Sequence, residues 1–384
     1  MLRFRVPVPR LLSAGEIFSG RGCIGVLRSL AAVRTVLIWE PPISHNEELK
    51  TLFKRALGTV DLRFVEKKPG EPRLSTINGV LAELVEFNPD WIVAVGGGSV
   101  IDCAKLAWAF YEHPDADLSR ITRPNGLPAL RGKARLVAAP TTAGTGSEVS
   151  SAALFIDDAT GSKRYVVSND FLPDVAVLDP TLAVSAPAAV TAISGLDALT
   201  HAVEGYVSRF SNPFIDMHAE TAVRKIFTYL KKCIEYPEDL EMRLQMMQAA
   251  LLAGWVQNLK IPGIAHAVAH QLGQFNVPHG LACGCLLPVA IRVNSEIVSV
   301  AAKYTSLANV LGLETAEELA AACEKLIYGM GIKLSVLDVV DGGLPRLKSQ
   351  YDNIAKGAQA DICARANPRP VDDRLVEKML EGLV

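Results

Sequence analysis

The chain has 384 residues, of which 49% are hydrophobic and 21% charged, and its formal net charge is -2. This balance is typical of a globular protein with a large core, and the length predicts two domains or at most three. Because the sequence contains no basic block, we do not expect nucleic acid or acidic membrane surfaces as partners.

Seven cysteines are scattered along the chain, and their odd number does not predict a disulfide framework. Reduced thiols in a cytoplasmic protein fit this pattern better. The first twelve residues, MLRFRVPVPRLL, are interrupted by Arg and Pro, so we expect no signal peptide there. The most apolar stretch, Gly280 to Ile291, is too short to span a bilayer and contains Gly and Pro.

The first half of the chain alternates strand-like and helix-like segments. Ser75–Phe87 has apolar residues at helical spacing, and Trp91–Val95 is a continuous apolar run, as in a strand buried on both faces of a parallel sheet. Further strands are predicted at Val36–Trp39, Leu62–Val65, Leu136–Ala139 and Val175–Leu178. This alternation predicts an α/β domain with a parallel sheet.

Three glycines, Gly96 to Gly98, follow the apolar run Trp91–Val95, and Ser99 is expected to open a helix. Glycines let a backbone come close to a ligand, and a helix N-terminus offers free N–H groups that suit a pyrophosphate. We interpret Ser99 as the N-cap, with Asp102 completing a capping-box-like pair. The alternative is a tight strand-to-helix turn without a ligand. The fingerprint G-x-G-x-x-G is absent here.

A second loop, Pro140 to Glu148, follows another predicted strand and contains two glycines and four hydroxyls. Hydroxyls and backbone amides bind phosphate, ribose or a carboxamide, although such a composition is also common in surface loops. Two such loops at the carboxyl ends of two strands favour a ligand site, because open α/β sheets bind ligands there.

From about Pro187 onward, long helical patterns follow one another and strand signals nearly vanish. The predicted helices are Ala189–Arg209, Asp216–Cys233, Leu240–Asn258, Ile264–Leu272, Glu296–Leu311 and Glu317–Tyr328. From about Gly331 we expect short helices. The change of pattern places a domain boundary near Leu182, so that residues 1–182 form an α/β domain and residues 183–384 an all-helical one.

Three of the seven histidines, His266, His270 and His279, fall within fourteen residues, and His201 lies upstream. Asp197 and His201 are four apart on a predicted helix, and His266 and His270 share that spacing, so each pair lies on one helical face. His279 is expected in the loop that follows. Three imidazoles and one carboxylate suit Zn²⁺, Fe²⁺ or a similar ion. The alternative is a set of unrelated core or surface histidines.

Two cysteines lie close to His279 in the run Cys283-Gly284-Cys285. In an apolar, Gly- and Leu-rich segment such a pair is more often core than ligand, so we leave both outside the predicted metal site. His45, His113 and His218 have no partners at ligand spacing and are interpreted as structural or surface residues.

The residues now described match a known pattern: the sequence resembles the iron-containing (group III) alcohol dehydrogenases. The matching segments lie between about Val36 and Pro288, and they are Gly96–Asp102, Pro140–Glu148, Lys163 with Pro173 and Asp179-Pro180, Gly195–His201 and Gly263–Pro288. The resemblance implies a dehydroquinate synthase-like architecture, with an α/β dinucleotide-binding domain, an all-helical domain and the active site between them.

The resemblance also implies the roles of individual residues. Asp197, His201, His266 and His279 would hold the catalytic metal, Fe²⁺ or Zn²⁺, and His270 would lie near the nicotinamide on the proton path. The NAD-binding set would include Gly97, Gly98, Ser99, Asp102, Thr141, Thr142, Thr145 and Lys163. The implied reaction is hydride transfer between NAD(H) and a primary alcohol, aldehyde or ketone whose oxygen is bound to the metal, which acts as a Lewis acid.

Glu40 closes the first apolar strand, where this family often has an Asp that binds the ribose. A carboxylate there accepts hydrogen bonds from the ribose hydroxyls and repels a 2′-phosphate, so we predict a preference for NAD over NADP. The alternative is a solvated strand end.

The segment Leu259-Lys260-Ile261-Pro262 departs from the family's common Asn- and Gly-rich run before the metal-bearing helix, and the loop from His270 to His279 is one residue shorter than in some relatives. Lys260 pointing into the cleft would attract an aldehyde with an acidic far end, such as a semialdehyde. The alternative is an ordinary surface lysine.

Two other classes of function remain open at this stage. One is a metal- and NAD-dependent cyclase or polyol-phosphate dehydrogenase on the same fold, and the other is a non-catalytic nucleotide- or metal-binding protein. We expect a small-molecule alcohol or aldehyde as the substrate, and a homodimer or higher homo-oligomer.

Overall fold

Six parallel strands form one sheet in the order β1-β8-β5-β4-β2-β3 in the computed structural model, which describes residues 13–123, 126–210, 212–332 and 335–383. The strands are β1 at Glu16–Ser19, β2 at Arg34–Trp39, β3 at Asp61–Glu66, β4 at Trp91–Gly96, β5 at Arg135–Pro140 and β8 at Val175–Leu178. A separate antiparallel hairpin pairs β6 at Ala152–Ile156 with β7 at Lys163–Val167.

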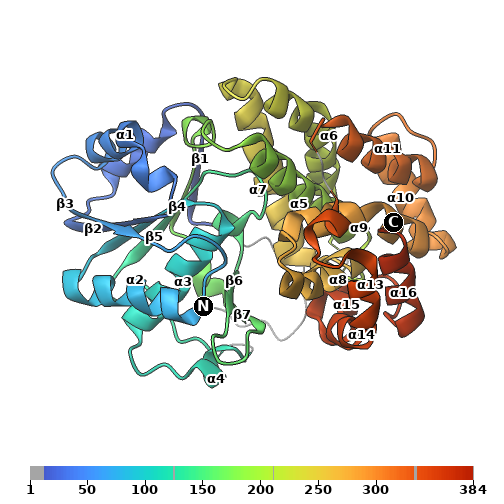
Figure 1. Cartoon of the computed structure of the whole chain (residues 1–384). Helices are drawn as coiled ribbons and strands as arrows, with labels where there is room; N and C mark the ends of the chain where they lie inside the picture. The colour runs from blue at the N-terminus through green and yellow to red at the C-terminus, as the bar shows by residue number, and fades with distance from the viewer. Residues whose placement is uncertain (1–12, 124–125, 211, 333–334, 384) are drawn as a thin grey trace.

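Helices cover both faces of this sheet. Successive residues of β2 alternate between the faces: Val36 and Ile38 pack with α2 and α3, whereas Leu37 and Trp39 pack with α1. In Figure 1 α1 lies above the sheet and α2 and α3 lie below it. The helices are α1 at Glu47–Leu57, α2 at Leu74–Phe87, α3 at Gly98–Glu112 and α4 at Leu118–Ile121.

Short 3-10 helices lie in the connections of both halves. They are η1 at Cys23–Ser29, η2 at Ile43–His45, η3 at Ser147–Val149, η4 at Asn169–Phe171, η5 at Pro180–Leu182 and η6 at Gly273–Phe275.

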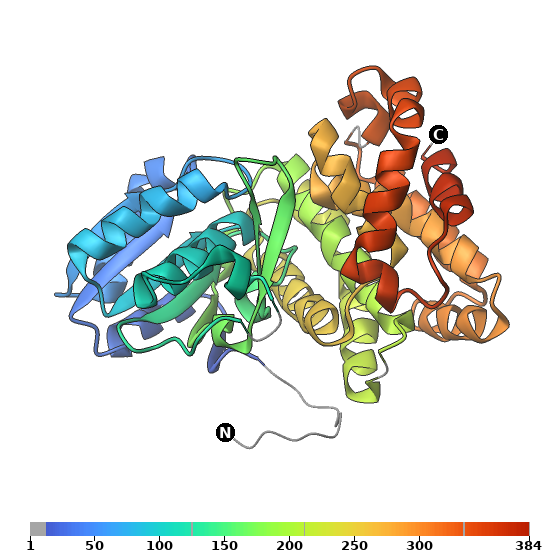
Figure 2. The ribbon, with the colours of Figure 1, turned by 90° about the horizontal axis from the view of Figure 1, so that it is seen from below.

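The second half of the chain is helical wherever it is described, and α5 is buried at its centre against α6, α7 and α9. Its helices are α5 at Ala188–Val207, α6 at Pro213–Glu235, α7 at Leu240–Lys260, α8 at Ile264–Leu272, α9 at His279–Asn294, α10 at Val298–Asn309, α11 at Ala316–Gly329, α12 at Val336–Val339, α13 at Gly343–Ser349, α14 at Tyr351–Ala360, α15 at Ile362–Ala366 and α16 at Asp373–Glu381. Seen from below, the sheet-containing half and the helical half lie side by side (Figure 2).

The fold class expected from the sequence is confirmed, as are the predicted strands, the six long helices and the short helices after Gly331. The prediction of no signal peptide concerns residues 1–12, which lie outside the described residues. No helix among the described residues is both long enough and apolar enough to cross a membrane. The last strand ends at Leu178 and α5 begins at Ala188, and the boundary near Leu182 stays a prediction.

Two local predictions were wrong. His279 is the first residue of α9, not part of a loop, and α9 continues through Pro288 to Asn294. Ser99 is not an N-cap, because α3 begins at Gly98 and Gly97 caps it without a side-chain hydrogen bond. The sequence analysis also missed β1, α1 and the β6–β7 hairpin.

The pairing of β4 with β5 brings the two glycine- and hydroxyl-rich loops together. Gly96 at the end of β4 lies opposite Pro140 at the end of β5, so both loops leave the sheet at adjacent points of one edge. The second loop then contacts the helical half: Gly146 has a φ of 62°, and a Cβ added to it would lie 2.4 Å from Cα of Gly254 in α7. Glycine at both positions is what allows this close approach.

Candidate active site

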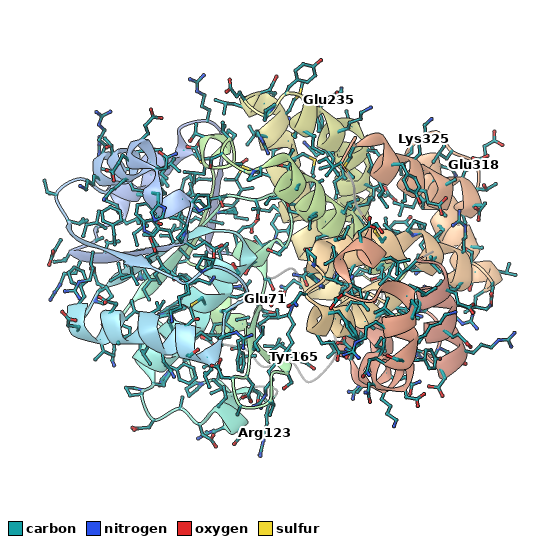
Figure 3. All side chains as sticks on the ribbon, in the orientation of Figure 1. Glu71, Arg123, Tyr165, Glu235, Glu318 and Lys325 are labelled. Atoms are coloured by element: carbon teal, nitrogen blue, oxygen red, sulfur yellow. The ribbon has the colours of Figure 1, made fainter. Side chains whose placement is uncertain are left out.

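A cavity of about 580 Å³ lies between the sheet-containing half and the helices. Its α/β wall comes from the start of α3, the loop after β5 and the β6–β7 hairpin, and its helical wall from α5, α8, α9 and the segment after α7. Figure 3 labels Glu71 and Tyr165, two of the lining residues, on the side of the α/β half that faces the helices. A cavity of this size accommodates a cofactor or a drug-sized ligand.

Asp197 is the centre of the helical wall. Its Oδ1 atom lies 3.9 Å from Nε2 of His201, 3.7 Å from Nε2 of His266 and 3.5 Å from Nε2 of His279. Asp197 and His201 come from consecutive turns of α5, His266 from α8 and His279 from the first residue of α9. The structure therefore brings together all four residues that the sequence analysis selected as metal ligands.

Two of these atoms have no hydrogen-bond partner although they are buried: Oδ1 of Asp197 and Nε2 of His266. The side chains of Asp197 and His266 are only 4% and 2% exposed. A buried carboxylate oxygen without a partner is costly in free energy, and a divalent cation removes that cost. The donor set therefore fits a divalent metal held between three imidazoles and a carboxylate.

The pKa shifts within the site differ from residue to residue. Burial lowers the pKa of His201 to about 4 and holds the pKa of His279 well below its ordinary value, which favours the neutral imidazole that binds metals. Burial also acts to lower the pKa of His266, but the neighbouring Cys283, Asp197 and Glu204 raise it well above its ordinary value, so His266 would release a proton when a metal binds. Although burial raises the pKa of Asp197, the three surrounding imidazoles hold it well below its usual range, which favours the ionised carboxylate.

Glu204 orients His266, a role that the sequence analysis missed. Its carboxylate lies 2.7 Å from Nδ1 of His266 and also accepts hydrogen bonds from the backbone N–H groups of Gly263, Ala265 and His266 at the start of α8. This contact places the proton on Nδ1 and leaves the Nε2 lone pair facing the site. The spacing of three residues after His201 on α5 was the available signal, because it puts Glu204 on the same helical face.

His270 lies in the cavity wall beside the four candidate ligands. Its Nδ1 atom is 2.8 Å from Oδ2 of Asp361, and its ring stacks on that of His279 with centroids 5.0 Å apart. Burial raises the pKa of Asp361, but the hydrogen bond to His270 outweighs this and keeps the pKa below its ordinary value. No sequence signal connected the two residues, because they are 91 positions apart.

Part of the predicted cofactor set lines the α/β wall of the large cavity, namely Gly98, Ser99, Asp102, Thr145 and Lys163. Gly98 opens α3 directly against Thr145, because a Cβ on Gly98 would lie 2.6 Å from Oγ1 of Thr145. The free N–H groups of α3 thus begin next to the loop after β5, as an anion site requires. The ammonium of Lys163 lies 3.0 Å from a carboxylate oxygen of Glu71.

Asp102 does not complete a capping box. Its carboxylate accepts hydrogen bonds from Oγ of Ser147 and from the backbone N–H of Leu154, which attaches the loop and the β6–β7 hairpin to α3. Lys105, one turn later, does similar work: its buried ammonium donates to the carbonyl oxygens of Ser147, Ser150 and Ala152, and burial lowers its pKa to about 8. Both side chains hold the shape of the α/β wall of the cavity.

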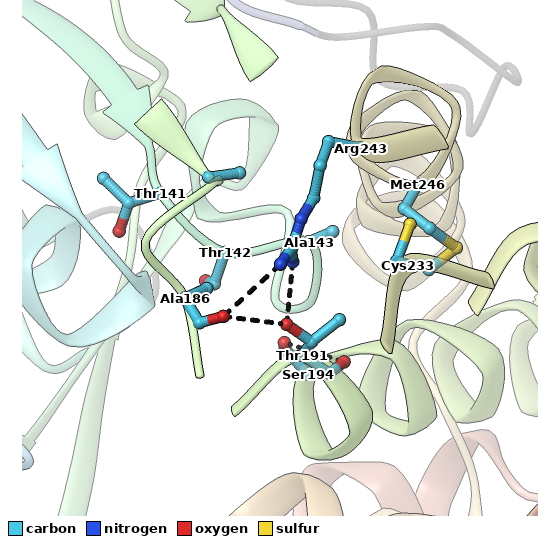
Figure 4. Close-up of a pocket in the computed structure, with 10 residues that line it drawn as sticks. Thr141, Thr142, Ala143, Ala186, Thr191, Ser194, Cys233, Arg243 and Met246 are labelled. Carbon is cyan, nitrogen blue, oxygen red and sulfur yellow. Dashed lines mark hydrogen bonds between the residues drawn. The ribbon is translucent and has the colours of Figure 1, made fainter. Parts of the chain in front are cut away.

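Other predicted cofactor residues lie outside the wall of the large cavity. Thr141 and Thr142 line a small cavity of about 10 Å³ beside Arg243, with room for about one water molecule. Figure 4 shows the Arg243 guanidinium donating to Oγ1 of Thr191 and to the carbonyl of Ala186. Gly97 is the N-cap residue of α3 and directly precedes Gly98, the first residue of the helix.

Glu40 lies beside the large cavity without lining it. Its carboxylate accepts a hydrogen bond from Oγ of Ser99 at 3.3 Å and pairs with the buried ammonium of Lys67 at 2.7 Å. The charge of Glu40 is therefore partly neutralised by a lysine that the sequence analysis did not consider.

Lys260 does not reach the cavity, and both interpretations of it were wrong. Its side chain is fully buried, so it is not a surface lysine. Its ammonium pairs with the carboxylate of Asp216 in α6 and donates to the carbonyl of Tyr206, so it is not available to a substrate. Its place at the last turn of α7 turns the side chain toward α5 and α6 and away from the cavity.

Comparisons with known proteins agree along most of the chain. A sequence model described as iron-containing alcohol dehydrogenase matches residues 14–180, and one described as the C-terminal part of the Fe-containing alcohol dehydrogenase family matches residues 191–384. The chain is 33% identical to the NADPH-dependent butanol dehydrogenase of Clostridium saccharobutylicum, over 99% of this chain and 97% of that protein.

Two further proteins show the same likeness. The probable alcohol dehydrogenase EutG of Salmonella typhimurium is 36% identical, over 95% of this chain and 90% of that protein. The solved structure of an iron-containing alcohol dehydrogenase from Thermococcus thioreducens superimposes with a TM-score of 0.90 at 28% identity, and the match covers 97% of this chain and 99% of that one.

Proposed function

The chain belongs to the iron-containing alcohol dehydrogenase family, and from that premise we propose that Asp197, His201, His266 and His279 hold its catalytic divalent metal. It is an oxidoreductase that transfers a hydride between a nicotinamide cofactor and an alcohol or aldehyde. The observation that carries the ligand assignment is the pair of buried, unpartnered atoms, Oδ1 of Asp197 and Nε2 of His266, which face each other at 3.7 Å.

In this proposal the helical wall of the cavity binds the metal and the α/β wall binds the cofactor. When bound, the metal supplies Lewis acidity toward the substrate oxygen. The start of α3 at Gly98 and Ser99 binds the pyrophosphate of the cofactor, while Thr145 and Lys163 hold the cofactor against the helical wall. Asp361 fixes the His270 ring through Nδ1, so that Nε2 of His270 holds or passes on the proton that the alcohol loses.

We propose NAD as the preferred cofactor, because a carboxylate at Glu40 lies beside Ser99 and disfavours a 2′-phosphate. Lys67 weakens this preference by pairing with Glu40, and the relative from Clostridium saccharobutylicum is named for its dependence on NADPH. The ratio of kcat/KM for NADH to that for NADPH measures the preference. A higher kcat/KM with NADPH would refute it.

We propose neutral aliphatic primary alcohols and their aldehydes as the substrate class. The side chains on the helical side of the cavity include Ile193, Ile261, Pro262 and Ile362, all apolar. Lys163 is the one lysine or arginine among the described residues that line the cavity, and it is paired with Glu71. The semialdehyde alternative depended on Lys260 and is not proposed, because Lys260 does not reach the cavity.

A chain-length series tests this proposal. Protein reconstituted anaerobically with Fe²⁺ or Zn²⁺ is assayed for NAD⁺ reduction by primary alcohols of increasing length, and each alcohol is compared with the hydroxy acid of the same length. We expect the neutral member of each pair to have the higher kcat/KM. Equal or better turnover of the acids would contradict the substrate class, and absence of turnover with every alcohol would contradict the function.

Three further proposals concern the domains, the cellular compartment and the oligomeric state. We propose that residues 1–182 and 183–384 act as a cofactor domain and a catalytic domain, that the enzyme works in the cytoplasm, and that it forms a homodimer or higher homo-oligomer. The scattered, odd set of seven cysteines supports a reducing compartment. Size-exclusion chromatography with light scattering measures the oligomeric state.

A further inference from the structure

Ile261 connects α7 to the segment before α8, the helix that carries the proposed metal ligand His266, and its backbone conformation is unusual. It follows the last residue of α7 with a φ of 57° and a ψ of 130°. Residues with a branched Cβ rarely adopt a positive φ, because the side chain then crowds the backbone. A strained residue of this kind persists only where its surroundings determine the conformation, and such residues are frequent at functional sites.

Hydrogen bonds on both sides of Ile261 hold this conformation. Directly before it, the carbonyl oxygen of Lys260 accepts a hydrogen bond from Oγ of Ser208. Two residues after it, the backbone N–H of Gly263 donates to Oε2 of Glu204 at 3.0 Å. The proline that follows Ile261 restricts it further, because a residue before proline is confined to an extended ψ, as is found here. The backbone at Ile261 is therefore fixed by its neighbours.

The same segment connects the two walls of the large cavity. Three residues before Ile261, Oδ1 of Asn258 accepts hydrogen bonds from the N–H and the hydroxyl of Ser151, directly before β6 on the α/β wall. On the other side, the Glu204 oxygen that binds the segment after Ile261 also lies 2.7 Å from Nδ1 of His266. Ile261 therefore lies between a contact to the proposed cofactor wall and a contact to the proposed metal site, where cofactor and substrate come together.

The side chain of Ile261 forms part of the cavity wall. It lines the large cavity, is partly buried, and packs against the apolar cluster that includes residues of α8 and α9. Ile193, one turn before Asp197 on α5, lines the same cavity and packs against the same cluster. Because the backbone of Ile261 is fixed on both sides, its side chain cannot move aside for a wider substrate without releasing those contacts.

We propose that Ile261 is a specificity-determining residue: it narrows the cavity beside the carbon chain of the substrate and so favours unbranched primary alcohols over branched ones. This inference rests on the proposed function. A single carbon more or less in an apolar pocket changes kcat/KM about 10–200-fold, so one rigid side chain is enough for such a preference. The segment Leu259-Lys260-Ile261-Pro262 is also where this sequence departs from the common run of its family.

Removal of the side chain tests the proposal. In metal-reconstituted enzyme, kcat/KM is measured for 1-butanol and for 2-methyl-1-butanol, which differ by one methyl branch, in the wild-type protein, Ile261→Gly and Ile261→Ala. We expect the ratio of unbranched to branched substrate to fall about tenfold in both variants, with metal content and NADH affinity unchanged. Ile234→Ala is the matched control, because Ile234 is also partly buried but lies in α6 and does not line the cavity.

The outcomes separate this inference from the proposed function. An unchanged ratio in both variants of an active enzyme would overturn the role of Ile261 and leave the proposed function intact. Absence of turnover with every alcohol in the wild-type protein would overturn both. If neither variant folds, Ile261→Val, which removes one methyl group, decides on the same ratio: we expect a fall of about threefold, and no fall would overturn the role.

Thermal unfolding tests the fixed backbone on which the rigid wall depends. At most positions glycine stabilises a folded protein less than alanine does, because it loses more conformational freedom on folding. At a positive φ this order reverses, since alanine is strained there and glycine is not. We therefore expect a higher Tm for Ile261→Gly than for Ile261→Ala. The opposite order would overturn the constrained conformation of Ile261.

Discussion

The two walls of the cavity obtain their binding capacity in different ways. On the α/β wall, the functional groups are backbone N–H groups at the start of α3 and small side chains, and the charged residues nearby, Asp102 and Lys105, are fully occupied in holding the loop. On the helical wall, the functional groups are side-chain atoms, and three of them are buried without a hydrogen-bond partner: Oδ1 of Asp197, Nδ1 of His201 and Nε2 of His266.

This difference between the walls predicts which kind of substitution each wall is sensitive to. A wall built from backbone groups is sensitive to steric change, because an added Cβ displaces the loop that shapes it. A wall built from unpartnered side-chain atoms is sensitive to chemical change, because each atom is a ligand that no neighbour replaces. Variants of the two walls should therefore separate metal binding from cofactor binding.

The largest effect is expected at the helical wall. His266→Ala removes a donor atom and should lower kcat/KM by about a thousandfold or more, equivalent to about 4 kcal/mol, together with metal content. NADH affinity should stay within about twofold, because the cofactor loops lie on the other wall. Metal analysis, steady-state kinetics and fluorescence titration with NADH measure these quantities. His218→Ala is the control, since His218 lies on α6 against Trp255. Full metal content in His266→Ala would refute the ligand assignment.

A smaller loss, of metal affinity, is expected for Glu204, which contacts the proposed ligand His266. Glu204→Gln keeps the shape of the side chain but replaces one of the two carboxylate oxygens, which accept hydrogen bonds from N–H groups, by an NH₂ group that donates. The charged acceptor that fixes the proton on Nδ1 of His266 is then lost. Metal affinity should fall about 10–100-fold. Competition with a chelator measures it, and Glu220→Gln, whose carboxylate accepts from the Tyr206 hydroxyl, is the matched control. Unchanged metal affinity in Glu204→Gln would show that Glu204 only caps α8.

The opposite pattern is expected at the α/β wall. In Gly98→Ala the new methyl group would lie 2.6 Å from Oγ1 of Thr145, so the start of α3 and the loop must separate. NADH affinity should fall about tenfold, or about 1.4 kcal/mol, with metal content unchanged. Gly79→Ala in α2, where an added Cβ meets nothing within 4 Å, is the control. Metal loss in Gly98→Ala would mean that the two walls are not separable.

The smallest effect on activity is expected at Lys260. Lys260→Met leaves Asp216 and the carbonyl of Tyr206 without their buried partner, so the free energy of unfolding should fall by about 1–3 kcal/mol. The KM values for an acidic aldehyde and for a neutral aldehyde of similar length should both stay unchanged. Chemical unfolding and steady-state kinetics measure the two effects. A selective rise of KM for the acidic aldehyde would restore the substrate role.

The sequence determined the features that local pattern and spacing encode. Continuous apolar runs identified β4 and β5, helical periodicity identified α5 and α8, and a spacing of four residues put Asp197 with His201 on one helical face. These signals depend on how side chains repeat along a single helix or strand, and that repeat can be recognised in the sequence without any tertiary contact.

Only the tertiary structure decided how separate elements meet. The pairing of His270 with Asp361 and the burial of Lys260 against Asp216 both depend on helix packing. Lys260 shows the physical reason: its sequence neighbours indicated a junction, but the direction of its side chain was set by which helix supplied a carboxylate to the buried ammonium. A buried charge takes its partner from whichever element packs against it, and sequence distance carries no information about that element.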